Sequence, residues 1–576
     1  MIKKLRNILL ILIVGLLVLA SCGGADQPGD TSTDGEGNEE TYDSLSESEV
    51  KELLKNMSIT IPSSSEMFKN RDKNPEYTLK GSIEVVFSET GVTFDQKYSK
   101  YLEADGTTLK IKYGNSFNIS GSCSNGTIIV ETSKDEKTNL VLNNLNLKNS
   151  SFSPIYVKSA DKVFIIPIGD NTLEITGVIS QIDSNTVNSV IFSKDDLTIQ
   201  GEGKISITSN IYSGIVCKDD LKITGGTLDI TSGAHALEAN DTIRISGGSI
   251  EVNVTKDALH INENENTSLS YLYMEGGKIC GYAKGDAIDA AGNIYILGGE
   301  IDIRCGNGYS SAKDDTSTKG LRTPSNIVIC GGKISIDSSD DSIHSASNIV
   351  IYNSDITVKS GDDAIHADSQ IVIAGGLVDI KNGYEGLEAL NVEIKGGKVT
   401  INAIDDGINA AGGVDTSSSD FKPTFETSLI SISGGYVYIN AMGDGIDANK
   451  NIEISGGKVF IEGPVNNSNS PVDFGGDAKI TGGTFIAIGS DAMAHNFTIA
   501  TQGSLFIPLE TTYEAGTVIS LKNSQGQEIF SYTTTKPFIS VVLSSPDLNI
   551  NESYSISIGD TVKNFTLTSI LYNFER

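Results

Sequence analysis

Residues 331–353 read GGKISIDSSDDSIHSASNIVIYN, and this stretch holds one complete unit of a repeat that runs through most of the chain. Residues 333–337 alternate apolar and polar side chains, and residues 342–344 and 348–351 are short β-branched segments. Alternation with a period of two is typical of β-strands. The unit therefore predicts three short strands, each of which turns isoleucine or valine side chains toward a narrow core.

A double glycine opens each unit, and its spacing sets the period of the repeat. The step is 22 residues from Gly225 to Gly247, and again from Gly276 to Gly298. A fixed period indicates stacked units, in which one residue per unit becomes a column of like residues. The sequence thus predicts an all-β fold, namely a parallel β-helix with three short strands in each coil of about 22 residues.

The first 21 residues have the features of a signal peptide. Lys3, Lys4 and Arg6 precede an apolar run over residues 8–20 that is too short to span a bilayer. The run ends Leu-Ala-Ser-Cys22, which resembles the bacterial lipobox and implies cleavage before Cys22 and lipidation of that residue. The alternative is an ordinary secretion signal followed by a chance cysteine. We expect a lipid-anchored protein on the extracellular face of a bacterial membrane.

The rest of the chain divides by composition. Residues 22–45 are acidic and poor in apolar side chains, which predicts a disordered tether. Residues 46–76 predict a helical or irregular lead-in, with Val50, Leu53, Leu54 and Met57 on one helix face. The repeats occupy residues 77–503. Residues 504–576 lose the glycine period and predict a small C-terminal β cap.

The charge of the chain excludes one class of partner. Without residues 1–21, which hold three bases and no acid, 40 Lys and Arg face 74 Asp and Glu, a net charge of −34. Nucleic-acid binding requires a basic surface, so we expect no nucleic-acid partner. An acidic surface suits cations, or acidic ligands held through cations. We expect a monomer.

Two columns of polar residues follow nine and twelve positions after the double glycine. The first column reads His235, Asp257, Asp286, Lys319, Asp341, Asp363, Glu385, Asp406, Asp444. The second column reads Glu238, His260, Asp289, Arg322, His344, His366, Glu388, Asn409, Asp447. Of the 5 histidines in the chain, only His495 lies outside these columns, although nothing in a turn between strands requires imidazole.

Stacked carboxylates predict a bound cation. Neighbouring strands lie about 4.8 Å apart, so acids in successive units repel one another. Ca²⁺ takes oxygen ligands at about 2.3–2.6 Å and fits between two such carboxylates. The alternative is a purely structural ladder, in which the acids bond backbone amides and pair with histidine. Zn²⁺ is less favoured, because it requires three or four tightly placed ligands and no unit contains two histidines.

Lys319 and Arg322 interrupt the acidic columns directly after an inserted segment, residues 306–318. One interpretation is neutralisation of Asp286, Asp289 and Asp341 by salt bridges. The other is an anion-binding site, or a general base beside a calcium-bound sugar acid. Neighbouring acids raise the pKa of a lysine, which weighs against catalysis. Two further insertions, residues 262–270 and 411–427, are expected to form loops.

Several motifs together resemble a largely clostridial family of secreted, right-handed parallel β-helix proteins that bind carbohydrate. They are KDDLTIQGEG at residues 194–203, the LKITGG and IEISGG repeats, and the recurrent Asp-Gly-Ile-Asp and Asp-Ala-Ile-His tetrapeptides. The resemblance spans about residues 80–565. It implies calcium binding and recognition of cellulose and of acidic sugars such as polygalacturonate, on a fold related to pectate lyases but without catalysis. The acids that match the motif are Asp286, Asp289, Asp341, Asp363, Asp406, Asp444 and Asp447. The chain departs from the motif at Lys319–Arg322 and at Glu385–Glu388.

From these observations we expect a cell-surface lipoprotein that binds acidic polysaccharide through a calcium-loaded face. The expected metal ligands are Asp257 and the seven acids that match the motif, and the expected sugar ligands are Lys319, Arg322, His344 and His366. The alternatives are a pectate-type lyase with Lys319 or Arg322 as base, and a structural adhesin or spacer.

Overall fold

The computed structural model describes residues 42–75, 79–262, 269–311, 316–411, 427–465 and 468–575. The chain divides into two compact units, residues 1–40 and 41–576, and the second contains all of these residues. The expected signal peptide and the lipidation at Cys22 lie outside the described residues, as does most of the expected tether. None of the described helices is long and apolar enough to cross a membrane.

Strands make up 55% of the structure and helices 5%, so the all-β class is confirmed. The main sheet has 43 strands. It is a closed parallel barrel of 12 strands with many outer strands, so the prediction of a right-handed parallel β-helix with three short strands per coil and a small C-terminal β cap is wrong. Several long strands contain the double glycine, and their pairing register shifts at that point. In β18 (Ile243–Val254), Gly248 has φ of 82°, which bends the chain there.

Close approach of neighbouring repeats explains why the second glycine is needed. A Cβ atom on Gly248 would lie 2.9 Å from the carbonyl oxygen of Gly226 in the preceding repeat. The same bend at Gly277, Gly299, Gly457 and Gly483 lies within 12-residue strands. In these repeats long strands bend at the double glycine, whereas in others, such as at Gly225 and Gly331, the double glycine lies between two strands; in both cases glycine removes the side chain that would hold the backbones apart.

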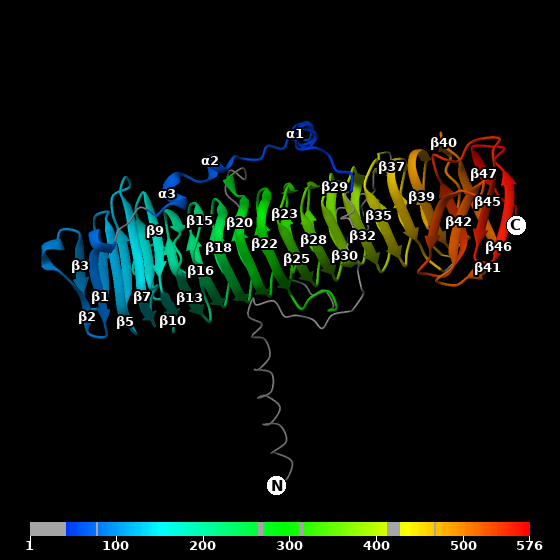
Figure 1. The fold of residues 1–576 in the computed structure, drawn as a ribbon. Helices are drawn as coiled ribbons and strands as arrows, with labels where there is room; N and C mark the ends of the chain where they lie inside the picture. The colour runs from blue at the N-terminus through cyan, green and yellow to red at the C-terminus, as the bar shows by residue number, and fades with distance from the viewer. Residues whose placement is uncertain are drawn as a thin grey trace, which may run out of the picture. The chain divides into compact units, whose positions relative to one another are not determined.

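Parallel pairing links each repeat to the next, with partners 22 residues apart in several repeats, as for Ile336 and Val358. Three ladders result (Figure 1). The first ladder contains β1 (Ile83–Ser88), β5 (Ser116–Cys123), β7 (Lys137–Asn149), β10 (Asp170–Ile175), β13 (Lys204–Ser209), β16 (Thr227–Ser232), β18, β20 (Leu272–Ala283), β22 (Ile294–Cys305), β25 (Lys333–Ser338), β28 (Asp355–Ser360), β30 (Leu377–Asn382), β32 (Lys398–Ala403), β35 (Tyr436–Ala441), β37 (Asn451–Glu462) and β39 (Ala478–Gly489).

The second ladder carries the two polar columns. It contains β4 (Thr108–Ile111), β6 (Thr127–Glu131), β8 (Ile155–Ser159), β11 (Ser189–Ser193), β14 (Ser213–Cys217), β17 (Leu237–Ala239), β19 (Leu259–Ile261), β21 (Ile288–Ala290), β23 (Leu321–Thr323), β26 (Ile343–Ser345), β29 (Ile365–Ile373), β31 (Leu387–Ile394), β33 (Ile408–Ala410), β36 (Ile446–Ala448) and β38 (Val472–Phe474).

The third ladder shares its long strands with the other two. Its own members are β9 (Lys162–Ile168), β12 (Asp196–Ile199), β15 (Leu221–Ile223), β24 (Ile327–Ile329), β27 (Asn348–Ile351), β34 (Leu429–Ile432) and β40 (Ile499–Ala500). Apolar side chains from all three ladders form one continuous core, to which Ile334, Ile343 and Ile349 contribute as expected.

Antiparallel strands lie at both ends of this stack. At the N-terminal end, β2 (Gly91–Phe94) pairs with β1, and β3 (Leu102–Asp105) pairs with β4. At the C-terminal end, β44 (Phe538–Ser544) pairs with β39 and with β41 (Ser504–Tyr513), which also pairs with β47 (Leu571–Asn573). A separate four-stranded sheet has the order β43 (Glu528–Thr533), β42 (Val518–Asn523), β45 (Ser553–Ile558) and β46 (Thr561–Thr566).

A helical strap, residues 42–74, lies along the outside of the third ladder (Figure 1). It contains α1 (Glu47–Asn56), α2 (Ser64–Met67) and α3 (Asn70–Lys73). The expected helix is present as α1, which begins at a capping box formed by Ser46 and Glu49 and buries Val50 and Leu54. The strap packs on Tyr273, Tyr295, Val328, Val350 and Val372, and so covers an apolar stripe that the stack would otherwise expose. Two 3₁₀ helices, Leu79–Gly81 and Gln96–Tyr98, follow it.

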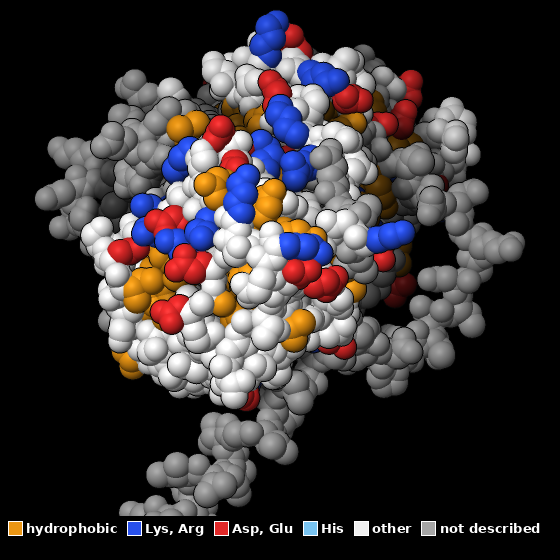
Figure 2. Space-filling view, turned by 90° about the vertical axis from the view of Figure 1, so that its left-hand side faces the viewer, with side chains coloured by type: hydrophobic (Ala, Val, Ile, Leu, Met, Phe, Trp, Pro, Cys, Tyr) orange, Lys and Arg blue, Asp and Glu red, His pale blue; other side chains and the backbone are white. Residues whose placement is uncertain are grey.

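The N-terminal end of the stack has a mixed charge. Figure 2 shows this end, where Lys and Arg side chains alternate with Asp and Glu and no histidine is visible. Exposed pairs such as Lys97–Asp95 and Lys112–Glu103 account for part of this pattern. Because the charges on this face are mixed and solvated, it carries no concentrated site.

Candidate functional site

The second column forms an aligned row in the structure. In the parallel register, each member lies opposite the next, from Glu238 through His260, Asp289, Arg322, His344, His366, Glu388 and Asn409 to Asp447. The row continues to Asp473 in β38, which the sequence analysis missed. The segment Val472-Asp473-Phe474 has the same apolar–Asp–apolar pattern as residues 446–448, but no regular spacing pointed to it.

The first column ties consecutive repeats together through the backbone. The Asp257 carboxylate accepts a hydrogen bond from the amide of Asp286 at 2.9 Å, and Asp286 accepts one from the amide of Lys319 at 2.7 Å. The same contact recurs from Asp341 to the amide of Asp363 and from Asp406 to that of Asp444. These acids therefore have a structural role, which was one of the alternatives that the sequence left open.

Two histidines converge on Asp257. The Nδ1 atoms of His235 and His260 lie 3.1 and 3.0 Å from Asp257 Oδ2, and His260 Nδ1 lies 3.3 Å from Asp289 Oδ2. Burial disfavours the charged imidazole of His260, but hydrogen bonds to Asp257 and Asp289 outweigh it and raise its pKa to about 10. Burial likewise opposes ionisation of Asp257, yet hydrogen bonds from both histidines hold its pKa below the usual range.

Lys319 is buried. Its Nζ lies 2.9 Å from Asp340 Oδ1 and also bonds Asp341, and only 7% of the residue is exposed. Burial disfavours the ammonium, but Asp341 and Asp340 more than compensate and raise the pKa of Lys319. Lys319 thus neutralises Asp340 and Asp341 in a buried ion pair. Asp340 is a partner that the spacing of the columns did not predict.

Arg322, in contrast, faces solvent. Its side chain is 44% exposed, and its guanidinium lies 3.2 Å from Asp289 Oδ1 and 3.8 Å from Asp286 Oδ2. Burial, followed by repulsion from Asp257, raises the pKa of Asp286 to about 7. The structure therefore separates Lys319 and Arg322, which the sequence treated together: one is internal and the other is available to a ligand.

His344 and His366 stack with ring centroids 4.9 Å apart. His344 Nδ1 lies 2.8 Å from Asp341 Oδ2, and His366 Nδ1 lies 2.8 Å from Glu388 Oε2 and 3.3 Å from Asp363 Oδ2. The His366 side chain is 2% exposed. Of these two expected sugar ligands, only His344 reaches the surface.

The acids at the C-terminal end of the columns lack basic partners. Among the described residues, no lysine, arginine or histidine forms an ion pair with Asp406, Asp444 or Asp447. Burial, and then repulsion from neighbouring acids, raises the pKa of Asp406 to about 7 and those of Asp444 and Asp447 to about 6. The two columns are therefore divided into a part neutralised by bases and an acidic part.

The carboxylates of the acidic part offer only oxygen ligands, which is the donor set that Ca²⁺ takes. Asn409 Oδ1, which lies beside Asp447 in the register, is buried and accepts no hydrogen bond from any described residue. A buried acceptor without a donor next to repelling carboxylates is the environment that a bound cation would satisfy.

A groove runs along the neutralised part of the columns. One section, of about 400 Å³, is lined by His260, Asp289, Arg322 and His344, among others. The adjoining section includes His235 and Glu238, and the two share His260 and Asn262. The groove is thus lined by Arg322 together with three of the histidines, His235, His260 and His344.

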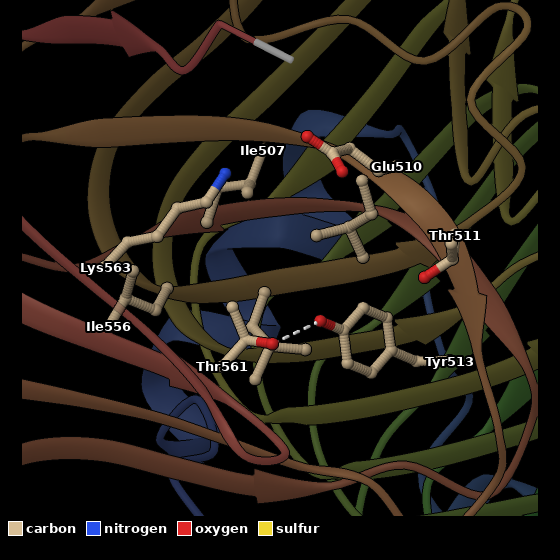
Figure 3. Close-up of a pocket in the computed structure, with 9 residues that line it drawn as sticks. Ile507, Glu510, Thr511, Tyr513, Ile556, Thr561 and Lys563 are labelled. Atoms are coloured by element: carbon tan, nitrogen blue, oxygen red, sulfur yellow. Dashed lines mark hydrogen bonds between the residues drawn. The ribbon is translucent and has the colours of Figure 1, made fainter.

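Another cavity, of about 290 Å³, lies among the C-terminal antiparallel strands (Figure 3). Its floor is Ile507, Leu509, Ile556 and Ile558, and Glu510, Thr511 and Lys563 surround it. Tyr513 and Thr561 bond each other at 2.9 Å across one side. This cavity contains none of the column residues, and its titratable groups are few, so the columns are the stronger candidate site.

Comparison with known proteins supports a carbohydrate ligand. The family described as carbohydrate-binding domain-containing protein matches residues 105–364 and 363–555. A carbohydrate-binding domain-containing protein of Acetivibrio thermocellus is 36% identical over 241 residues, which cover 39% of this chain and 84% of the relative. The solved structure of a polysaccharide lyase-like protein from C. thermocellum, a gadolinium derivative, is 29% identical with a TM-score of 0.39, and the match covers 43% of this chain and 96% of that one.

Proposed function

This chain belongs to the family of carbohydrate-binding domain-containing proteins, and we propose that its ligand is an acidic polysaccharide such as polygalacturonate, bound in the groove past Arg322. The exposed guanidinium of Arg322 carries this proposal. Arginine pairs with carboxylates through two parallel hydrogen bonds, and it stays charged at any physiological pH. The protonated His260 supplies a second cation in the same groove.

We propose that Ca²⁺ binds the acidic part of the columns, with Asp406, Asp444, Asp447 and Asp473 supplying oxygen ligands. Calcium there would neutralise the carboxylates whose pKa values burial and repulsion raise. Its positive charge would also favour a uronate chain that extends beyond the groove. Asp257 and Asp341, which were expected as calcium ligands, bond histidine or lysine instead and fit this role less well.

The lyase alternative finds no support in the two candidate bases. A general base must be deprotonated at working pH. Neighbouring acids raise the pKa of Lys319, and arginine does not deprotonate in proteins. We therefore propose binding without cleavage. We also propose that Cys22 anchors the protein to the membrane, which membrane fractionation of the wild type and of Cys22→Ser would test.

A glycan array probed with calcium and with chelator tests the main proposal. We expect polygalacturonate to bind, binding to fall in chelator, and neutral glucans to bind more weakly. Equal binding to acidic and neutral glycans would contradict the role of Arg322. An absence of all glycan binding would favour the adhesin or spacer alternative. Unsaturated uronate products, detected by their ultraviolet absorbance, would restore the lyase alternative.

A further inference from the structure

The histidines of the two columns meet across repeats and not within them. His235 belongs to the first column, and His260 belongs to the second column of the following repeat. Their rings stack with centroids 4.4 Å apart and planes 23° from parallel. The sequence argument against a transition metal was that no repeat contains two histidines. That argument fails, because stacking brings ligands from neighbouring repeats together diagonally.

The polar atoms of this pair converge on one point. His235 Nδ1 and His260 Nδ1 lie 3.1 and 3.0 Å from the same atom, Asp257 Oδ2. One ring nitrogen of each histidine and one carboxylate oxygen of Asp257 lie within 4.8 Å of one another. In a tetrahedral zinc site with bonds of about 2.0–2.1 Å, ligand atoms are separated by roughly 3.3 Å. The two distances to Asp257 Oδ2 are close to this separation, and the third lies within 4.8 Å, so the three residues can surround a small divalent ion after a small adjustment.

We propose that His235, Asp257 and His260 form a site for a divalent transition metal, with Zn²⁺ the favoured ion. Two imidazoles and one carboxylate are borderline donors that suit Zn²⁺ and not Ca²⁺, which takes oxygen ligands. Three protein ligands leave a fourth position. His235 and His260 both line the groove, so the site lies at the groove surface.

The second histidine pair differs in a way that makes it a control. His344 and His366 also stack beside an acid, Asp341. However, the ammonium of Lys319 already bonds that carboxylate, and His366 is almost fully buried. A bound cation there would compete with a lysine that the fold holds in place. The metal site is therefore assigned to the first pair alone.

The test measures Zn²⁺ binding to the untagged full chain by titration calorimetry after removal of metals, with no glycan present. We expect one site, and we expect His235→Ala, His260→Ala and Asp257→Asn each to weaken binding by roughly a hundredfold or more, since even supporting residues outside the first shell account for 10–100-fold. His344→Ala, and His495→Ala at an exposed position, should leave the affinity unchanged. Co²⁺ bound to the wild type should show the intense visible absorption of a tetrahedral site.

Three results would overturn the site. They are unchanged Zn²⁺ affinity in His235→Ala and His260→Ala, an equal loss in His344→Ala, and displacement of Zn²⁺ by equimolar Ca²⁺. If an alanine variant fails to fold by circular dichroism, Asp257→Asn, which keeps the size of the side chain, decides the question. Because no glycan is used, failure here leaves the proposed carbohydrate binding unaffected.

Discussion

The carboxylate of Asp406 accepts a hydrogen bond from the backbone amide of Asp444 at 2.6 Å, and so joins two consecutive repeats. Both residues are acidic and partly buried, and burial followed by repulsion from neighbouring acids raises both pKa values. One contact thus stabilises the stack through the backbone while it concentrates negative charge. Because hydrogen bonding and charge repulsion oppose each other here, the stability of the stack should depend on bound cations and on pH.

Calcium should stabilise the protein. Binding to the folded state alone raises the free energy of unfolding by about 2.7 kcal/mol when free calcium is one hundred times its Kd. Scanning calorimetry should show a higher Tm in calcium than in chelator, and Asp447→Asn should reduce the difference. Asp302 is an exposed acid on the first ladder, so Asp302→Asn is the matched control and should leave the Tm difference between calcium and chelator unchanged. Identical Tm values in calcium and chelator would show that calcium does not bind the folded protein.

In chelator, stability should fall as pH rises from 5 to 8. Asp406, with a pKa of about 7, and Asp444 and Asp447, at about 6, bind protons more tightly in the folded state than in the unfolded state. Stability therefore decreases as pH rises toward these folded values. His260 acts in the same direction, because its raised pKa of about 10 provides stability that is lost as pH approaches 10.

Acids with lowered pKa values, such as Asp257, stabilise the fold fully at any pH above their unfolded pKa. Their contribution to stability therefore does not change between pH 5 and 8. Thermal unfolding in chelator at pH 5, 6, 7 and 8 measures the trend. The Asp406→Asn/Asp444→Asn double variant should reduce the slope of Tm against pH, with Asp447 and His260 still contributing. A Tm that rises with pH in the wild type would show that these carboxylates do not carry the raised pKa values.

Arg322→Ala and Lys319→Ala should have different effects. Arg322→Ala removes a charge-assisted bond worth about 1.5–3 kcal/mol, so the affinity for polygalacturonate should fall about tenfold to a hundredfold. Its Tm should change little, because exposed ion pairs contribute about 0–1 kcal/mol. Lys319→Ala breaks a buried pair and leaves Asp340 and Asp341 close together, which should destabilise the fold by about 3–5 kcal/mol.

Titration calorimetry gives the affinity and chemical denaturation gives the stability for each variant. Arg322→Lys is the conservative control, and it should restore the charge but not the two-bond geometry. If Lys319→Ala lost binding at full stability and Arg322→Ala did not, the anion would bind at Lys319 and not at Arg322.

The strap should detach when its apolar contact is weakened. Leu54 is 5% exposed and packs against the stripe that contains Val350 and Val372. Leu54→Ala should lower the free energy of unfolding by about 2–5 kcal/mol, and by less if neighbouring side chains move in to fill the space. Hydrogen exchange should become faster in residues 47–56 and along the stripe. Lys51→Ala, on the exposed side of α1, should leave exchange unchanged, and a Leu54→Ala variant with wild-type exchange would mean that the strap contributes little.

Zinc and calcium should occupy separate parts of the columns. His260→Ala should weaken Zn²⁺ binding and leave the calcium-dependent rise in Tm intact, whereas Asp447→Asn should have the opposite effect. Ligand chemistry separates the ions, because imidazole nitrogen suits Zn²⁺ and oxygen-only sites suit Ca²⁺. Loss of both responses in either variant would indicate one shared site.

The sequence predicted the repeat well and its architecture poorly. The double glycines and the alternating isoleucines correctly predicted parallel pairing between repeats, with partners 22 residues apart in several of them. The expected three short strands per coil and the β-helix built from them were wrong, because the sequence does not reveal whether a glycine ends a strand or bends it. In β18 the pairing register shifts between Ser246 and Ser249, so that residues before the double glycine pair in the third ladder and residues after it pair in the first, which only the folded chain shows.

What the sequence alone determined is the row of residues that shares one register, from Glu238 to Asp447, because side-chain position in a ladder follows directly from spacing. What the tertiary structure decided is how each side chain uses that position. Lys319 turns inward to Asp340 and Asp341, Arg322 stays in solvent, and His235 meets His260 over Asp257. These outcomes depend on rotamers and on burial by neighbouring repeats, and both arise only when the repeats stack.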